Sequence, residues 1–195
     1  MIKHKRFDEG KLLKTGQLTQ YGGYNDDGFY EMGISKRYTV LTLGVYAGHT
    51  HIIMNGKDEP HDNACVYDRR TKLMWSRYFP HHVGPAADGK MPWTTNVNGE
   101  GIFAYCVLAN AALLAGYSDW RIPNLLETMS ILDLEAPTAF PNAVAFPSVP
   151  STDYVWTSTT RPSLIINAMT AIFEHGFGYI HTKTDDRFMM LVRGG

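Results

Sequence analysis

Aromatic and basic side chains alternate near the C-terminal end of this 195-residue chain, as they would along one face of a β-strand. If the strand is regular, one face carries Phe177, Tyr179, His181, Lys183, Asp185 and Arg187, which alternate with Gly178, Ile180 and Thr182. We single out Tyr179, His181, Lys183 and Arg187. Aromatic rings stack on the apolar faces of sugars, and Lys or Arg binds acidic groups. The four residues are therefore the candidate ligand-binding residues. The solvent-facing side of an antiparallel sheet produces the same alternation, so the pattern alone leaves a plain wet surface as the other interpretation.

The eight histidines invite a comparison with metal sites. His49 and His51 would lie on the same side of a strand, and residues 81–82 are a His-His pair in a predicted loop. Zinc needs three or four converging ligands, and nothing in this spacing brings them together. The acidic pairs at 26–27 and 185–186 lack the alternating oxygen ligands of a calcium loop. We predict no metal and no cofactor.

Motifs that support catalysis are missing from the sequence. The chain contains no G-x-S-x-G turn, no phosphate-binding loop and no dinucleotide fingerprint. The hydroxyl run at 157–160 is explained by polar residues at a strand edge, and Glu127 and Glu135 show no sign of pairing. We therefore predict that the protein is not an enzyme and has no catalytic residues.

The charge balance argues against several partners. The chain has 18 basic and 19 acidic residues, so no basic surface for nucleic acid is expected. Basic residues exceed acidic ones in residues 1–14, which we interpret as a solvated arm. No apolar run approaches a membrane span, so we expect no membrane insertion, and the first residues lack the apolar core of a secretory signal. We expect a chain made in the cytoplasm, which would reach the exterior by another route, such as host lysis with a virus particle.

The hydrophobic pattern predicts an α+β fold with two helices, short antiparallel sheets and long loops. Helices are expected at 101–115 and at about 125–134. A C-type-lectin-like domain has this element order, as do other α+β folds. Strands and connecting segments are expected as follows: strands at 37–42, 49–54, 65–68, 73–75, 154–159, 168–173, 179–184 and 188–192, a hairpin at Asp27-Gly28, a turn at 174–178, and long loops at 80–99 and 136–153.

The segment between the two helices has a recognisable turn chemistry. Gly116 is placed to end the first helix as its C′ residue, and Asn124 is placed to cap the second with Glu127 three residues on. Trp120 is expected to fill core space, and Asp119 and Arg121 to pair with each other or to bind loop carbonyls. This turn is therefore interpreted as structural rather than as a binding loop.

Five separated segments resemble one known family in the same order. They are Asp68-x-x-Thr71-x-Leu73-Met74-Trp75, Ala104-Tyr105-Cys106, Gly116-Tyr117-Ser118-Asp119-Trp120-Arg121-Ile122-Pro123-Asn124-x-x-Glu127, Trp156-Thr157-Ser158-Thr159, and Lys183 with Leu191-Val192-Arg193. The pattern resembles the Lcl C-terminal domain family, named for a bacterial collagen-like adhesin and also found in phage genomes. The resemblance implies adhesion or ligand binding, with sulfated glycans and trimers as the associations of its adhesin member.

The resemblance divides the chain into an N-terminal arm and β-rich attachment region at 1–63 and a recognition domain at 64–195. Many family members end in Val-Arg-Cys, whereas Gly194 follows Arg193 here, so Cys106 lacks its usual partner. Cys65 and Cys106 are left either as a pair in an oxidising setting or as two buried thiols.

Together these observations predict a non-enzymatic recognition protein of a phage virion, in its tail or fibre, or of a cell surface. It would bind host-surface glycan, acidic or sulfated, and assemble with other virion proteins as a homotrimer. The alternative is a structural virion subunit, in a capsid decoration or a baseplate, with no ligand of its own.

Overall fold

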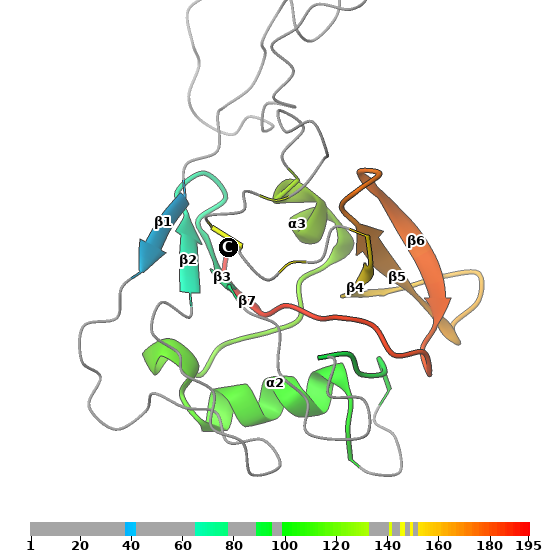
Figure 1. The fold of residues 1–195 in the computed structure, drawn as a ribbon. Helices are drawn as coiled ribbons and strands as arrows, with labels where there is room; N and C mark the ends of the chain where they lie inside the picture. The colour runs from blue at the N-terminus through cyan, green and yellow to red at the C-terminus, as the bar shows by residue number, and fades with distance from the viewer. Residues whose placement is uncertain are drawn as a thin grey trace, which may run out of the picture.

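A computed structural model describes residues 38–41, 65–77, 89–94, 99–132, 141, 145, 146, 149 and 152–195. The elements are β1 (Tyr38–Leu41), β2 (Cys65–Asp68), β3 (Leu73–Ser76), α2 (Ile102–Ala111), the 3₁₀ turn η1 (Leu114–Gly116), α3 (Leu125–Ser130), β4 (Tyr154–Thr160), β5 (Asn167–Ile172), β6 (Phe177–Thr182) and β7 (Val192–Gly194). They form two antiparallel sheets and two helices, which confirms the predicted α+β class. Figure 1 shows the sheets on opposite sides of the domain, with α3 between them and α2 running beneath.

Several predictions fall outside the described residues. These are the arm at 1–20, the hairpin at Asp27-Gly28, the strand at 49–54 with its two histidines, the His-His pair at 81–82 and most of the two long loops. Among the described residues, no helix is long and apolar enough to cross a membrane.

The first sheet pairs strands from the two ends of the predicted recognition domain, residues 64–195. Its strand order is β1-β2-β3-β7, and every neighbouring pair is antiparallel. The β2–β3 turn is closed by Asp68, whose carboxylate accepts hydrogen bonds from the backbone N–H of Arg70 and the hydroxyl of Thr71, both at 2.9 Å. This Asx turn explains why an Asp-x-x-Thr sequence precedes the buried strand β3.

The second sheet has the order β4-β5-β6 and is built from two hairpins. The β5–β6 turn contains Gly176 at φ 72°, a left-handed conformation that favours glycine, and confirms the hairpin predicted at 174–178. The pairing register shifts between Trp156 and Thr160, so β4 carries a bulge before its end. Packed beside this sheet, α3 brings Leu125 against Gly178, where a Cβ would lie 3.1 Å from the leucine side chain.

Both helices begin where predicted but end about four residues earlier. The predicted C′ residue Gly116 is wrong, because α2 ends at Ala111 and Leu113 takes the left-handed conformation at φ 52°. The early end has a physical reason: the reversal leaves the Leu114 carbonyl free to accept a bond from the Trp120 indole. The capping box of α3 is confirmed, since Asn124 accepts from the Glu127 N–H and the Glu127 carboxylate accepts from the Asn124 N–H.

The strand predicted at 188–192 is wrong for most of its length. Only Val192 of that segment belongs to a strand, β7, while residues 188–191 run between the two sheets. The Phe188 carbonyl accepts from Trp156 of β4, and the Leu191 carbonyl accepts from Ser76 of β3. Residues 189–191 are all buried, so this segment is a core crossing rather than a strand with one wet side.

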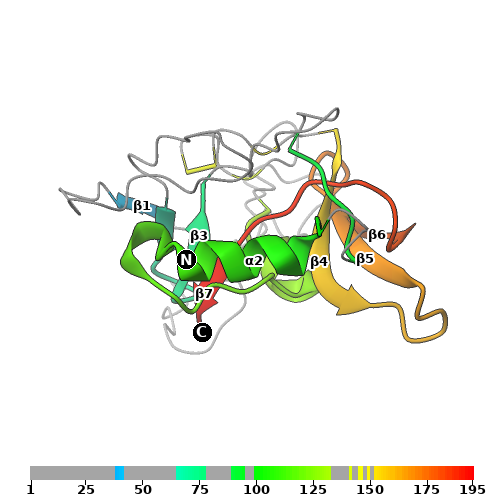
Figure 2. The ribbon, with the colours of Figure 1, turned by 90° about the horizontal axis from the view of Figure 1, so that it is seen from below.

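The core has two clusters, and Figure 2 shows α2 lying across the face that joins both sheets. Trp156 belongs to the cluster beneath α2, and Trp75 belongs to the other. Cys65 and Cys106 are buried free thiols, so the structure has the predicted alternative of two buried thiols and not the disulfide. Burial raises the pKa of the Cys65 thiol to about 12 and also raises the pKa of the Cys106 thiol.

Candidate functional site

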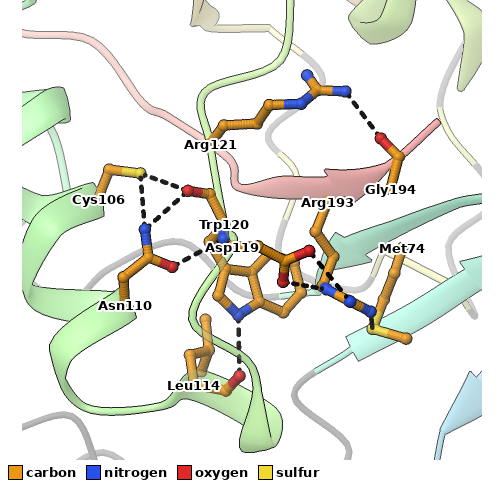
Figure 3. A network of polar contacts seen from close by, with 9 residues as sticks. All are labelled: Met74, Cys106, Asn110, Leu114, Asp119, Trp120, Arg121, Arg193 and Gly194. Atoms are coloured by element: carbon orange, nitrogen blue, oxygen red, sulfur yellow. Dashed lines mark hydrogen bonds and ion pairs between the residues drawn. The ribbon is translucent and has the colours of Figure 1, made fainter.

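The turn between the helices is anchored by the backbone and indole of Trp120. The Trp120 indole N–H donates to the Leu114 carbonyl at 2.8 Å. Asn110 forms two bonds with the Trp120 backbone, accepting from its N–H at 2.7 Å and donating to its carbonyl at 2.8 Å. The Cys106 thiol donates to the same carbonyl at 3.1 Å. Figure 3 shows these groups converging from α2 and η1 on one residue, which leaves the Trp120 backbone no capacity for a ligand.

Two arginines then fasten this turn to the C-terminus. Arg193 of β7 donates to both oxygens of Asp119, at 2.6 and 3.1 Å, and lies 3.6 Å from the centre of the Tyr117 ring. The hydrogen bond from Arg193 lowers the pKa of Asp119. Of the two predicted alternatives, the Asp119–Arg121 pair is wrong, because Arg121 points to the other side (Figure 3) and binds Glu127. The alternative of a bond to a backbone carbonyl holds for Arg121, which donates to the Gly194 carbonyl.

Arg121, the second arginine, binds Glu127 of α3 as well as the C-terminal strand. Its two terminal nitrogens lie 2.7 and 2.6 Å from the carboxylate, and one also donates to the Gly194 carbonyl at 3.1 Å. Burial acts to raise the pKa of Glu127, but the bonds from Arg121 and from the Asn124 N–H outweigh it, so the pKa is lowered. We call Asp119–Asn124 together with Glu127 and β7 the junction. Its polar groups are paired with one another, which supports the structural interpretation.

Among the described residues, a second group of aromatic and basic side chains lies on the sheet of β4, β5 and β6. These side chains have fewer polar partners than those of the junction. Tyr154 of β4 lies 5.4 Å from Tyr179 and 4.3 Å from His181, measured between ring centroids, and both partners come from β6. The Arg187 guanidinium lies 5.7 Å from the centre of the Tyr154 ring. We call Tyr154, Tyr179, His181 and Arg187 the aromatic face. Tyr179 is 49% exposed, so a ligand can reach its ring.

Strand register explains why these rings meet. Across β5, Tyr154 is opposite Ile172 and Tyr179 is opposite Thr170, so both project to the same side of the sheet. His181 follows two residues after Tyr179, and its Nδ1 shares a 3.0 Å hydrogen bond with the Thr170 hydroxyl. That bond fixes the imidazole against the sheet, between the buried Trp156 and the exposed Tyr179.

Arg187 reaches the aromatic face by a different route from the predicted one. Strand β6 ends at Thr182, so a single alternating strand through Arg187 is wrong. The chain turns at Asp185, whose N–H donates to the Thr182 carbonyl, and Arg187 then forms two backbone bonds with Met91. This return brings the guanidinium over Tyr154.

Lys183 lies beyond the aromatic face, at the end of β6. Its ammonium group is 3.8 Å from the centre of the Trp93 ring and donates to the Thr160 hydroxyl at 2.9 Å. Within the described part of the chain, Lys183 has no acidic partner. The structure therefore brings Tyr179, His181 and Arg187 together and places Lys183 in a neighbouring contact.

Sequence analysis missed Tyr154 and Trp93. The Tyr-x-Trp alternation at the start of β4 was a signal for Tyr154, since it marks one face of a strand. Trp93 is in an irregular segment and is held by a bond from its indole to the Thr157 carbonyl, so no periodicity pointed to it.

The charges round the aromatic face are partly neutralised. Asp153 pairs with Lys90 at 2.6 Å, and Asp185 pairs with Arg187 at a looser 3.4 Å. Burial and the neighbouring Arg187 lower the pKa of His181, so its neutral form prevails at neutral pH. The part of the chain that the structure describes contains no group of three metal-binding side chains.

The described structure is a small α+β domain. The polar groups of its junction are paired with one another, and its aromatic face is exposed at Tyr179. The model of the Lcl C-terminal domain family matches residues 64–193, so this chain belongs to that family and contains an adhesin-type domain. No curated protein and no solved structure matches the chain. The C-type-lectin-like architecture accordingly stays a prediction.

Proposed function

We propose that this protein is a non-enzymatic recognition protein of a phage virion, part of its tail or fibre, that binds host-surface glycan through the aromatic face. The observation that carries the proposal is the gathering of Tyr154, Tyr179 and His181, with Arg187, at one accessible end of the sheet. The virion setting follows from the phage members of the family that the sequence resembles.

The geometry of the aromatic face suits a sugar ring. Sugars present apolar C–H faces that pack on aromatic rings, and Tyr179 offers its ring and hydroxyl at 49% exposure. The neighbouring Lys183 and Arg187 would meet acidic substituents. Lys183 is the better placed cation, because no described carboxylate competes for it, whereas Asp185 already contacts Arg187.

A glycan array with acidic, sulfated and neutral oligosaccharides tests this proposal on the purified full chain. We expect binding to acidic members, and we expect Tyr179→Ala with Lys183→Ala to weaken it by about tenfold or more. Leu126→Ala is the matched control, because Leu126 is an exposed aliphatic residue on α3, which packs on the Gly178 side of the sheet, opposite to the Tyr179 side. Equal binding by the double variant and the wild type would exclude the aromatic face as the binding surface.

A second candidate function, a structural virion subunit, is favoured by the outer side of α2. Phe103, Val107 and Leu108 are 39%, 67% and 47% exposed, and no charged residue occurs between Glu100 and Asp119. An apolar helix with an exposed side is typical of a helix that is covered in an assembly. We propose that this side forms the contact of a homotrimer, which serves either function.

Light scattering tests the proposed trimer contact, and glycan binding by the trimer then distinguishes the two roles. Val107→Glu should lower the mass from trimer to monomer, while Leu126→Glu, a charge added at another exposed position, should not. A trimer that binds no glycan and is found in purified particles by mass spectrometry would favour the structural subunit. A trimer that binds glycan supports the recognition protein.

A further inference from the structure

The tip of the β4–β5 hairpin exposes three consecutive aliphatic side chains. Leu164, Ile165 and Ile166 are 44%, 72% and 59% exposed. Turns between strands are ordinarily made of polar, Gly and Pro residues, so a Leu-Ile-Ile tip needs an explanation. Figure 1 shows this hairpin projecting from the edge of the second sheet, away from the helices.

The tip is held in one conformation by hydrogen bonds. The Leu164 N–H donates to the Arg161 carbonyl at 3.2 Å, and the Asn167 N–H donates to the Leu164 carbonyl at 2.9 Å. The Ile166 carbonyl accepts from the Lys183 N–H at 2.9 Å, and the Arg161 side chain donates to the Ser163 hydroxyl at 3.0 Å. The backbone carbonyls of Leu164 and Ile166 are therefore already paired, which lowers the cost of moving this turn out of water.

The fixed charges closest to the tip along its strands are positive. Between Thr157 and Thr170 the one charged residue is Arg161, and between Phe177 and Thr184 the one permanently charged residue is Lys183. The next acidic residues are Asp185, which contacts Arg187, and Asp186. The arrangement is an apolar tip with a cation on each side of its base.

Size and composition favour a lipid partner over a protein. A stable protein interface needs roughly 800 Å² on each partner, with aromatic or Arg residues at its centre. Three aliphatic side chains on a convex tip provide neither the area nor those residues. A bilayer needs no shape complementarity, and it rewards a few inserted aliphatic groups when basic residues meet its headgroups.

We propose that the β4–β5 hairpin tip inserts into the surface of an anionic lipid bilayer, with Arg161 and Lys183 at the headgroup level. The tip is far too short to span a membrane, so the contact is peripheral and reversible. The lipid contact shares Lys183 with the proposed glycan contact, whereas Leu164, Ile165 and Ile166 belong to the lipid contact alone. It would add a second, weaker attachment to a cell surface, through a tip too short to be found as a long apolar run in the sequence.

Vesicle co-sedimentation of the full chain, with no glycan present, tests this inference. We expect binding to mixed phosphatidylcholine–phosphatidylglycerol vesicles and much weaker binding to phosphatidylcholine alone. Ile165→Ser with Ile166→Ser should weaken binding to the mixed vesicles by about tenfold or more. Leu126→Ser, at an exposed aliphatic residue on α3 that lies outside the proposed trimer contact, should leave it unchanged. Thermal unfolding checks that each variant is folded.

Two results would overturn the inference. One is equal vesicle binding by the tip variant and the wild type, which would place the lipid contact elsewhere. The other is the absence of vesicle binding by the wild type. If the tip variant also showed a fall in oligomer mass on light scattering, the tip would be a protein contact. In a separate assay, Ile165→Trp should give a blue-shifted emission with mixed vesicles, and an unshifted spectrum would also exclude insertion.

Discussion

The junction and the aromatic face use their cations in opposite ways. At the junction, Arg121 and Arg193 each bind both oxygens of one carboxylate, at distances between 2.6 and 3.1 Å. At the aromatic face, Arg187 has one looser carboxylate contact, of 3.4 Å with Asp185, and it also donates to the Asp186 carbonyl at 2.6 Å. Lys183, beside that face, rests on a ring and a hydroxyl.

This difference separates scaffold from surface. A bidentate arginine–carboxylate pair has little capacity left for a ligand, because its charge and its donors are already satisfied. A cation held by a ring keeps its full charge and part of its donor capacity. The first region therefore holds the structure of the domain together, and the second keeps charge and donor groups that the proposed ligand would use.

Trp120→Ala is the change expected to have the largest effect, and it tests the scaffold side of this comparison. Trp120 is 2% exposed, so its removal leaves a large cavity and deletes the indole bond to the Leu114 carbonyl, which keeps only its bond from the Tyr117 N–H. We expect a loss of about 3–5 kcal/mol in the free energy of unfolding, measured by urea denaturation. Trp120→Phe, which keeps most of the volume, should cost less. A loss below about 1 kcal/mol for Trp120→Ala would contradict the view that the junction holds the domain together.

Glu127→Gln is the next change, with an effect that depends on pH. The folded-state pKa of Glu127 is lowered, so its charged form stabilises the fold above the ordinary glutamate pKa, and this stabilisation is lost as the pH falls through the lowered value. Because Arg121 is partly exposed, we expect a cost of about 0.5–1 kcal/mol at neutral pH that disappears in acid.

Urea denaturation across a pH series measures this prediction. Glu174→Gln is the control, because Glu174 lies in the exposed β5–β6 turn, where its described ion pair is a 3.9 Å contact with His175. If the cost of Glu127→Gln were the same at acidic and neutral pH, the Arg121 contact would contribute no charge-dependent stability.

Local chemistry made the junction predictable in outline. Asn124 and Glu127 are three residues apart at the start of an apolar stretch, and the capping box formed as expected. The partners of Asp119 and Arg121 were not predictable, because they come from β7 and α3, and the β7 partner lies over 70 residues away. Ion pairs across that separation depend on how the sheets are placed, which no local pattern encodes.

The aromatic face shows the same division between local and long-range information. The alternation of Tyr179 and His181 was visible because β6 is a regular strand. Arg187 joined them for a reason that the pattern did not contain, since the chain leaves β6 and returns beside Met91. Likewise, α2 ended early because Asn110 and Leu114 bind Trp120, a tertiary demand that overrides helix periodicity.

Tyr179→Ala is expected to change stability least, and it is the sharpest test of the difference between the two regions. Tyr179 is half exposed and its described contacts are with rings at one end of the sheet, so we expect a change in unfolding free energy within about 0.5–1 kcal/mol. Glycan binding should nevertheless fall by about tenfold, because the exposed ring is lost. Asp119→Asn should show the reverse, weakening the Arg193 contact and leaving binding intact. A Tyr179→Ala protein that unfolds as readily as Trp120→Ala would place this ring in the scaffold and remove the distinction on which the proposed binding surface rests.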